Sequence, residues 1–264
     1  VLVGSMDGKV CLVTGALGAL GLPISEGLAR EGATVVLHAR DEARAKAAVE
    51  AIKQKTGSSR VEYLIADVGS LAGVRKLAED FKARFQKLHV LVDNAAIFAG
   101  ERRMTPDNFE SMFGVNHLAP FLLTNLLLDV LKASAPSRVV VMTMDNTGPI
   151  RLDDLNSEKS FDKVKTLFHV KACQGAMVRV LARKLEGTGV VVNAVNPDVT
   201  KTTLIREAPW WLKLMFSLTG QTPEVGAKGP LMLAMDPALE KVSGKFFTKT
   251  RETPFPKAIG DDAT

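Results

Sequence analysis

A glycine-rich turn near the start of the chain is the first stretch whose residue types and spacing could do chemistry. Residues 10–21 read VCLVTGALGALG, so an apolar run is followed by three glycines. Gly15 permits a tight turn, and Gly21 allows a following helix to approach the strand closely. Glycines also end strands for purely structural reasons. A turn from strand to helix, however, presents backbone N–H groups to a phosphate. We predict a nucleotide site formed by Gly15, Leu17, Gly18, Leu20 and Gly21.

Alternating strand and helix patterns must hold this turn in place. Short apolar runs predict strands at 10–13, 34–38, 61–66, 90–92, 138–142, 190–195 and 245–247. Helical patterns begin at about residue 19 and cover 41–55, 71–85, 106–132 and 163–186. Continuous apolar strands between helices are typical of a parallel sheet covered on both faces. We therefore predict one α/β domain over residues 7–264, a doubly wound parallel sheet of about seven strands.

Bulk composition excludes several classes of function. The formal charge is +5, and no run of Lys and Arg interleaves with aromatic residues, so we expect no nucleic-acid partner. Cys11 and Cys173 lack metal-ligand spacing and suit a reducing compartment. We find neither an apolar run of the ~18–20 residues that span a membrane nor a signal-peptide pattern, and we expect a cytoplasmic protein without a metal. Residues 1–6 are interpreted as a cloning remnant.

Several motifs occur in the order found in one family. The turn at 14–21 resembles T-G-x-x-x-G-x-G, the pair Asp67-Val68 follows the third strand, and the motif DNAA at 93–96 resembles N-N-A-G. Further similar phrases lie at 115–118, 134–138 and 185–190. Together these motifs resemble the short-chain dehydrogenase/reductase family, especially its retinol-dehydrogenase-like branch. The resemblance implies a Rossmann fold that binds a nicotinamide cofactor across the carboxyl ends of the strands.

The type of cofactor can be argued from the end of the second strand. An enzyme that prefers NAD usually has an acid there, whereas this chain has Ala39 followed by Arg40. A guanidinium suits the 2′-phosphate of NADP, although Arg40 could instead simply begin a solvated helix. We predict NADP(H) rather than NAD(H). The resemblance implies further cofactor contacts at Asp67, Val68, Asn94, Ala95, Ala96, Lys171, Pro197, Val199 and Thr202.

The family's catalytic groups are only half present. Its tyrosine and lysine lie four residues apart on one helix face, and alignment on Lys171 places Leu167 at the tyrosine position. Alignment on the fifth strand places Met144 at the position of the catalytic serine. Lys171 and Asn116 match the lysine that holds the nicotinamide ribose and the asparagine that supports a proton-relay water. The groups that hold the substrate oxygen and exchange its proton are replaced.

Neighbouring polar side chains offer poor substitutes. His169 lies about 200° around the helix from Lys171, so we expect it to face away from the ribose as a packing or surface residue. Thr143 should point opposite to its successor because strand side chains alternate. Asp145 is kept as a candidate site residue, with a turn former as the alternative. Tyr63 is the one tyrosine of the chain, and its place in the third strand excludes it.

Further differences from the family lie in the cofactor pocket and beside it. Ala19 and Ala96 replace glycines, and Asp198 places a charge in the loop that normally contacts the carboxamide. Residues 203–220 contain Trp210 and Trp211 and match the family's mobile lid, which would favour a hydrophobic ligand. A membrane-surface helix and a dimer contact are the less favoured alternatives. The helix at 163–186 is similar to the one with which many relatives dimerise, so we expect a homodimer.

Two classes of function fit these residues. Hydride transfer to a carbonyl leaves an alkoxide that needs a proton, whereas transfer to an iminium leaves a neutral product. A chain without the serine and tyrosine therefore suits a cationic or conjugated hydrophobic acceptor, and a related variant uses the bound cofactor to shape a pocket for cyclisation. The second class is a non-catalytic protein that binds NADP(H) or a hydrophobic ligand as a sensor or scaffold. We favour the oxidoreductase because the cofactor-facing residues survive better.

Overall fold

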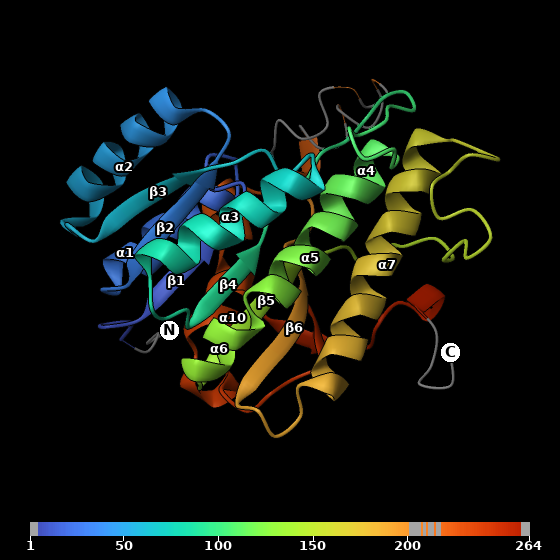
Figure 1. The fold of residues 1–264 in the computed structure, drawn as a ribbon. Coiled ribbons are helices and arrows are strands. Elements are labelled where there is room, and N and C mark those ends of the chain that lie inside the picture. The colour runs from blue at the N-terminus through green and yellow to red at the C-terminus, as the bar shows by residue number, and fades with distance from the viewer. Residues whose placement is uncertain (1–4, 201–206, 208–209, 211–213, 215–217, 260–264) are drawn as a thin grey trace.

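One sheet organises the chain, and the computed structural model describes residues 5–200, 207, 210, 214 and 218–259. Within this described part, eight strands follow the order β3-β2-β1-β4-β5-β6-β7-β8 (Figure 1). Neighbours are parallel as far as β7, and β8 is antiparallel to β7. The strands are β1 (Val10–Val13), β2 (Thr34–Ala39), β3 (Val61–Ile65), β4 (Val90–Asp93), β5 (Ser137–Met142), β6 (Val190–Asn196), β7 (Phe246–Thr248) and β8 (Arg251–Thr253). The predicted doubly wound single domain is confirmed.

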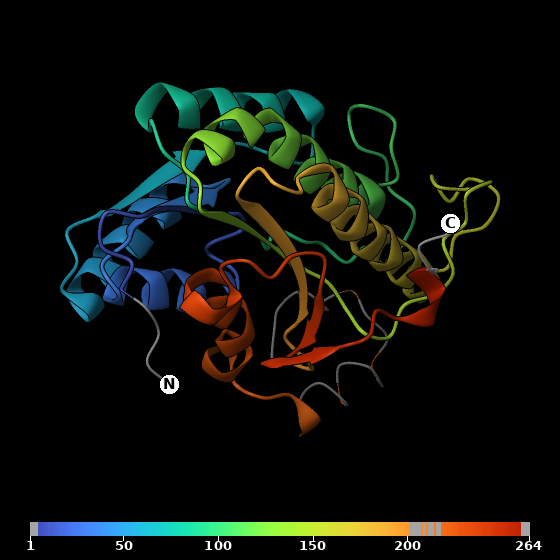
Figure 2. The ribbon, with the colours of Figure 1, turned by 90° about the horizontal axis from the view of Figure 1, so that it is seen from below.

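Helices cover both faces of the sheet (Figure 2). One face packs against α3 (Leu71–Arg84), α5 (Ala119–Leu126) and α7 (Lys163–Lys184), and the other against α1 (Gly21–Arg30), α2 (Glu42–Thr56) and α10 (Lys228–Met235). Shorter helices are α4 (Ser111–Phe113), α6 (Leu128–Ala133) and α9 (Pro223–Gly226). The alternation of β5 explains this sandwich, because Val139 and Val141 join the first apolar cluster while Val140 and Met142 join the second.

Helix boundaries follow from capping residues. Asp41 accepts a hydrogen bond from the backbone N–H of Arg44 at the start of α2, and Gly57 ends that helix with a left-handed backbone. Asp162 likewise accepts from Val164 N and Lys165 N at the start of α7. These caps explain why the predicted boundaries of both helices agree with the structure to within two residues.

The long helix predicted within 106–132 is present, but it starts later than predicted and is not a regular α-helix throughout. The helical segment begins at Ser111, because the Glu110 carboxylate accepts from the N–H groups of Met112 and Phe113 and caps α4. A π-helical turn, Gly114–Leu118, then leads into α5 and α6. Before this point Asn108 has a φ of +63°, so residues that the pattern assigned to a helix form a turn. Sequence periodicity does not distinguish a π turn from an α-helix.

The antiparallel strand β8 is absent from the sequence prediction. The chain reverses between β7 and β8 through Lys249, whose φ is +58°. Hairpin turns with positive φ usually carry glycine or asparagine, and the sequence T-K-T has neither. This reversal therefore gave no signal that could reveal an eighth strand.

Two predicted segments lie near the limits of the described chain. Met6, the last residue of the stretch interpreted as a remnant, is buried and packs in the core, whereas residues 1–4 lie outside the described residues. Thr202 and most of the lid predicted at 203–220, including Trp211, also lie outside them. Trp210 is described and is 76% exposed. None of the described helices is both long enough and apolar enough to cross a membrane.

Candidate active site

Hydrogen bonds from Thr14 and Asn94 fix the glycine-rich turn to the sheet. The Thr14 hydroxyl accepts from the N–H groups of Asn94 (2.9 Å) and Ala95 (3.0 Å), and it donates to Val92 O at 3.2 Å. The Asn94 side-chain amide donates to Thr14 O and Gly15 O at 2.9 and 3.1 Å. The carboxyl ends of β1 and β4 are thereby joined below the turn, where the order of the strands reverses.

His38 is a structural residue of this turn that the sequence analysis missed. Its Nδ1 accepts from Gly15 N at 3.2 Å, and its Nε2 lies 3.1 Å from Ala66 O. Burial lowers the pKa of His38 to about 4, so the ring is neutral and Nε2–H donates to the carbonyl. A lone polar residue in an apolar strand was the available signal.

The glycines of the turn leave no room for side chains. Gly15 has a φ of +60°, and a Cβ there would lie 2.8 Å from Ala95 Cα. A Cβ at Gly21 would lie 2.4 Å from Gly15 O, and one at Gly18 would lie 3.2 Å from the same oxygen. Helix α1 begins at Gly21, and Leu20 supplies no side-chain cap within the described structure. The turn therefore leaves the positive end of α1 open to an anion.

Most of the other predicted cofactor positions also lie at the carboxyl ends of parallel strands. Arg40 is exposed after β2, Asp67 is exposed after β3, and Val68 is buried in the core. Beside the turn and in the loop after β6, the half-buried residues include Leu17, Leu20, Asn94, Ala95, Ala96, Pro197 and Val199. Apart from Lys171 on α7, the described positions thus lie at or shortly after the carboxyl ends of β1, β2, β3, β4 and β6.

Lys171 is buried at the end of β5. Its side chain is 6% exposed, and Nζ donates to Met142 O at 3.0 Å. Burial lowers its pKa to about 8, so the charged form is only moderately favoured at neutral pH. Thr143 donates its hydroxyl to Lys171 O at 3.0 Å, which fixes α7 against the end of the strand.

Asn116 lies in the π-helical turn and is fully buried. Its side-chain oxygen accepts from Ile97 N at 2.8 Å, and its Nδ2 donates to Ile97 O at 3.0 Å. These two bonds tie the helix to the loop that follows β4. π-Helical turns occur frequently at functional sites, and here the turn places an asparagine against the cofactor-side loop.

Leu167 and Met144 pack in an apolar cluster next to Lys171. Leu167 is 8% exposed. Its cluster also contains Phe98, Ala99, Met112, Phe113, Val170 and Cys173, with Met144 packed against it. Neither side chain can donate a proton. The expectation that Thr143 points away from Met144 is wrong, because β5 ends at Met142 and Thr143 bonds to α7 while Met144 packs on a cluster containing α7 residues.

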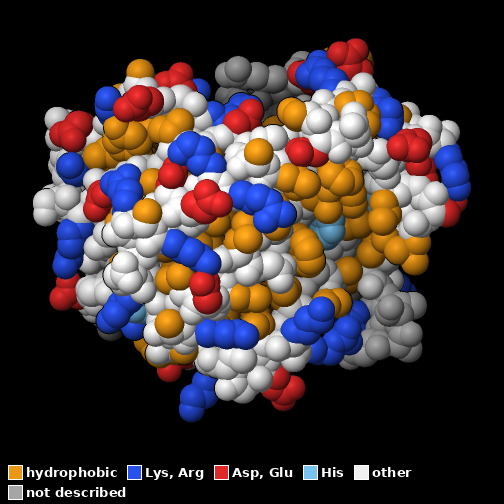
Figure 3. All heavy atoms as spheres, in the orientation of Figure 1, with side chains coloured by type: hydrophobic (Ala, Val, Ile, Leu, Met, Phe, Trp, Pro, Cys, Tyr) orange, Lys and Arg blue, Asp and Glu red, His pale blue; other side chains and the backbone are white. Residues whose placement is uncertain are grey.

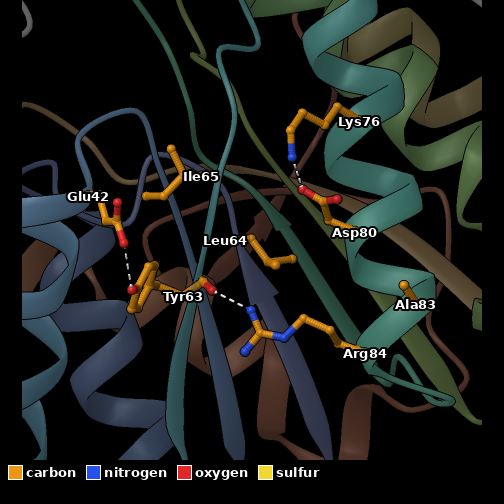
Figure 4. Close-up of a pocket in the computed structure, with 8 residues that line it drawn as sticks. All are labelled: Glu42, Tyr63, Leu64, Ile65, Lys76, Asp80, Ala83 and Arg84. Atoms are coloured by element: carbon orange, nitrogen blue, oxygen red, sulfur yellow. Dashed lines mark hydrogen bonds and ion pairs between the residues drawn. The ribbon is translucent and has the colours of Figure 1, made fainter.

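The polar neighbours weighed as substitutes are used elsewhere. His169 is buried, its Nδ1 accepts from Arg151 N at 3.1 Å, and its ring stacks on Phe113. Burial lowers the pKa of His169, so it is a packing residue. Asp145 is exposed in a bend. Tyr63 lies on the edge strand β3, in an open pocket of about 320 Å³, and its hydroxyl donates to Glu42 (Figure 4).

Comparison with known proteins decides the family. A family model described as enoyl-(acyl carrier protein) reductase matches residues 15–223. Retinol dehydrogenase 14 from Homo sapiens is 40% identical over 98% of this chain and 83% of its own length. The chain belongs to the short-chain dehydrogenase/reductase family. Retinol dehydrogenase 12 from Homo sapiens is 36% identical over 94% of this chain and 80% of its own.

Solved structures of short-chain dehydrogenase/reductase type agree with this fold. An uncharacterized protein from Mycobacterium paratuberculosis is 26% identical, with a TM-score of 0.80 over 99% of this chain and 90% of that one. A protein described as an NAD(P)-dependent gluconate 5-dehydrogenase from Beutenbergia cavernae, with bound NADP, is 26% identical, with a TM-score of 0.74 over 92% of this chain and 96% of that one. The family binds NAD(P) and acts as oxidoreductases.

Proposed function

We propose that the chain binds NADP(H) and transfers hydride to a small hydrophobic acceptor without the family's serine and tyrosine. The observation that best supports this proposal is the contrast between Lys171 and Leu167, two residues of α7. Lys171 is buried at the site, whereas Leu167, one helical turn away, packs in an apolar cluster with Met144. A reduced nicotinamide supplies the hydride when it is bound. The relatives' names support a small hydrophobic substrate, because they name retinol, which is a hydrophobic alcohol.

The shape of the glycine turn supports the cofactor. The positions at which a Cβ would collide with backbone allow a phosphate close to the start of α1. Arg40, exposed at the end of β2, would pair with the 2′-phosphate of NADP. In this proposal Lys171 holds the nicotinamide ribose, Asn116 orders the adjoining loop, and Asp145 remains a peripheral candidate.

The apolar cluster determines which acceptor is suitable. Reduction of a ketone creates an alkoxide, and the side chains at positions 144 and 167 offer it neither a hydrogen bond nor a proton. An iminium or a conjugated acceptor that needs no early proton avoids this difficulty. We therefore expect turnover with iminium substrates and little with simple ketones.

One experiment tests the function. NADPH consumption is followed by stopped-flow absorbance with aldehyde, ketone and iminium panels, and NADPH binding is measured by calorimetry. Consumption with the iminium panel supports the oxidoreductase, and brisk ketone turnover contradicts the assigned loss of the proton donors. Failure to bind either NADPH or NADH at millimolar concentration refutes the proposal.

The packing of Leu167 and Met144 also favours a second candidate. Side chains that complete a buried apolar cluster could serve a protein that binds NADP(H) or a hydrophobic ligand without reaction. Firm NADPH binding together with no consumption in all three panels would select this sensor or scaffold.

We further propose that the protein forms a homodimer through α5 and α7. Hydrophobic side chains gather over these helices (Figure 3). Phe121 and Val180 are 44% and 39% exposed there. Exposed apolar side chains on adjoining helices favour association with a matching surface.

A further inference from the structure

An ion pair joins two loops beside the proposed nicotinamide site. The Asp198 carboxylate, in the loop after β6, lies 2.6 Å from Lys249 Nζ in the turn between β7 and β8. Asp198 has a φ of +66° and Lys249 a φ of +58°. Left-handed backbone is costly for residues other than glycine and is retained where the surroundings impose it. Four of the described residues other than glycine have a positive φ, and two of them form this ion pair.

Backbone contacts to Asn196 hold both charges in position. Asp198 N donates to Asn196 Oδ1 at 2.9 Å, and Lys249 N donates to Asn196 O at 2.8 Å. Thr200 donates its hydroxyl to Asp198 O at 3.1 Å. The backbone of both residues is therefore fixed at the carboxyl end of β6, where the loop after β6 meets the turn between β7 and β8.

Stabilisation of the fold does not explain the pair. The two side chains are 36% and 55% exposed, and an ion pair so open to water contributes little to the free energy of unfolding. Burial by itself would raise the pKa of Asp198, but the hydrogen bond from Lys249, a backbone hydrogen bond and the charge of Lys249 together hold this pKa below its ordinary value. A permanent negative charge and its neutralising partner therefore stand at this loop.

We propose that Lys249 balances the charge of Asp198, so that neither charge biases the affinity of the site towards the oxidised or the reduced cofactor. This inference rests on the proposed function and on the family resemblance, which implies that the loop of Asp198 contacts the carboxamide of the nicotinamide. The oxidised ring carries a positive charge and the reduced ring is neutral. Asp198 alone would favour the oxidised ring, and Lys249 cancels most of that preference. The loop thus keeps the negative charge of Asp198 without a raised affinity for the oxidised cofactor.

The two charges predict opposite effects. Lys249→Gln leaves an uncompensated carboxylate, so the ratio of NADP⁺ affinity to NADPH affinity should rise about fivefold. Asp198→Asn leaves an uncompensated ammonium, so the ratio should fall by about the same factor. The double variant should return to the wild-type ratio. Asparagine suits Asp198 because it tolerates the left-handed backbone.

The test measures dissociation constants for NADP⁺ and NADPH by calorimetry on the wild type and the three variants. Lys245→Gln is the matched control, because it breaks a similarly exposed pair with Glu252 on the same hairpin and should leave the ratio unchanged. Thermal unfolding confirms that each variant is folded. If Lys249→Gln does not fold, Lys249→Met replaces it.

Opposite shifts that cancel in the double variant establish the inference. If the ratio of the two affinities is unchanged in both single variants, the inference is overturned while the proposed function stays intact. The same holds if both single variants shift the ratio in one direction, because that result would mean a loosened loop. A wild type that binds neither form of the cofactor overturns the proposed function as well.

Discussion

Two buried ionisable side chains lie at the carboxyl ends of the neighbouring strands β4 and β5, and neither has a charged partner among the described residues. Lys171 donates to a main-chain carbonyl, and burial lowers its pKa to about 8. Asp93, at the end of β4, accepts from the Thr124 hydroxyl at 3.0 Å, and burial raises its pKa to about 7. Within the described structure, Asp93 Oδ1 has no hydrogen-bond partner. Both groups therefore titrate close to physiological pH.

Asp93 makes stability depend on pH. Its pKa is raised from 3.8 to about 7 on folding, so the stability present below pH 4 is lost as the pH rises towards 7. The loss is on the order of 4 kcal/mol. Replacing the carboxyl by an amide removes this loss, but an unpaired buried amide N–H costs about 2 kcal/mol. Asp93→Asn should therefore be more stable than the wild type by about 2 kcal/mol at pH 8.

Denaturant unfolding between pH 5 and pH 8 measures this difference, which should shrink or reverse towards the acid end. Asp80→Asn on the surface of α3 is the control and should show no comparable change. An Asp93→Asn variant less stable than the wild type at pH 8 would contradict the buried-charge explanation.

The proposed replacement of the family's serine and tyrosine predicts a gain of function. Leu167→Tyr combined with Met144→Ser introduces a phenol one helical turn from Lys171 and a hydroxyl after β5. If the cofactor frame is intact, ketone reduction should rise by about 10²-fold over the parent, which is the usual scale of general acid catalysis. Steady-state NADPH oxidation measures it. Either single variant alone is the control, and no gain in the double variant would mean that the pocket has changed beyond these positions.

At the scale of elements, the junction of β1 with α1 forms the glycine-rich turn of the proposed cofactor site. In Gly21→Ala the new Cβ would meet fixed backbone, 2.4 Å from Gly15 O, so we expect a loss of about 3 kcal/mol of stability and loss of NADP(H) binding. Gly27→Ala is the matched control in the same helix, because its Cβ would meet only the flexible end of Leu231. That variant should stay within about 1 kcal/mol of the wild type and keep its affinity. Thermal unfolding and calorimetry measure both; equal effects would contradict the assignment.

The sequence patterns predicted the elements whose local signals agree with the fold. Strand β5 is buried along its whole length and apolar from Val139 to Met142, and α7 has an aspartate cap at its start. The helix predicted at 106–132 was correct except for its start and its regularity, because Glu110 caps a later start and a π turn follows. Strand β8 was missed because Lys249 makes its turn without glycine.

Prediction of the site divides in the same way. Motif spacing predicted that the Gly15 turn and Asn94 follow neighbouring strands and that Lys171 lies on an adjoining helix, and the structure has them there. The role of His38 and the pairing of Asp198 with Lys249 depend on contacts between segments distant in sequence. Such contacts leave no periodic pattern in a single chain, so sequence reasoning could not reach them.

At the scale of the whole molecule, the apolar face of α5 and α7 predicts self-association. Phe121→Glu places a charge in the proposed interface, so the dimer should dissociate into monomers while the fold is retained, because this side chain is 44% exposed. Analytical ultracentrifugation measures the change. Leu152→Glu, at a side chain that is 80% exposed in a loop, is the control. A wild type that is monomeric at high concentration would refute the proposed dimer.

The outer strand β3 has a consequence for the behaviour of concentrated protein. Arg84 donates to the main-chain oxygen of Tyr63 at 2.9 Å and pairs with Glu62, so charged groups occupy the rim of the sheet (Figure 4). An exposed edge strand can pair with strands of other molecules and so start fibril formation. A guanidinium that already occupies one carbonyl leaves an incoming strand fewer acceptors, and its charge repels like copies. We therefore expect Arg84 to reduce aggregation through β3, which lies at the end of the sheet farthest from α7.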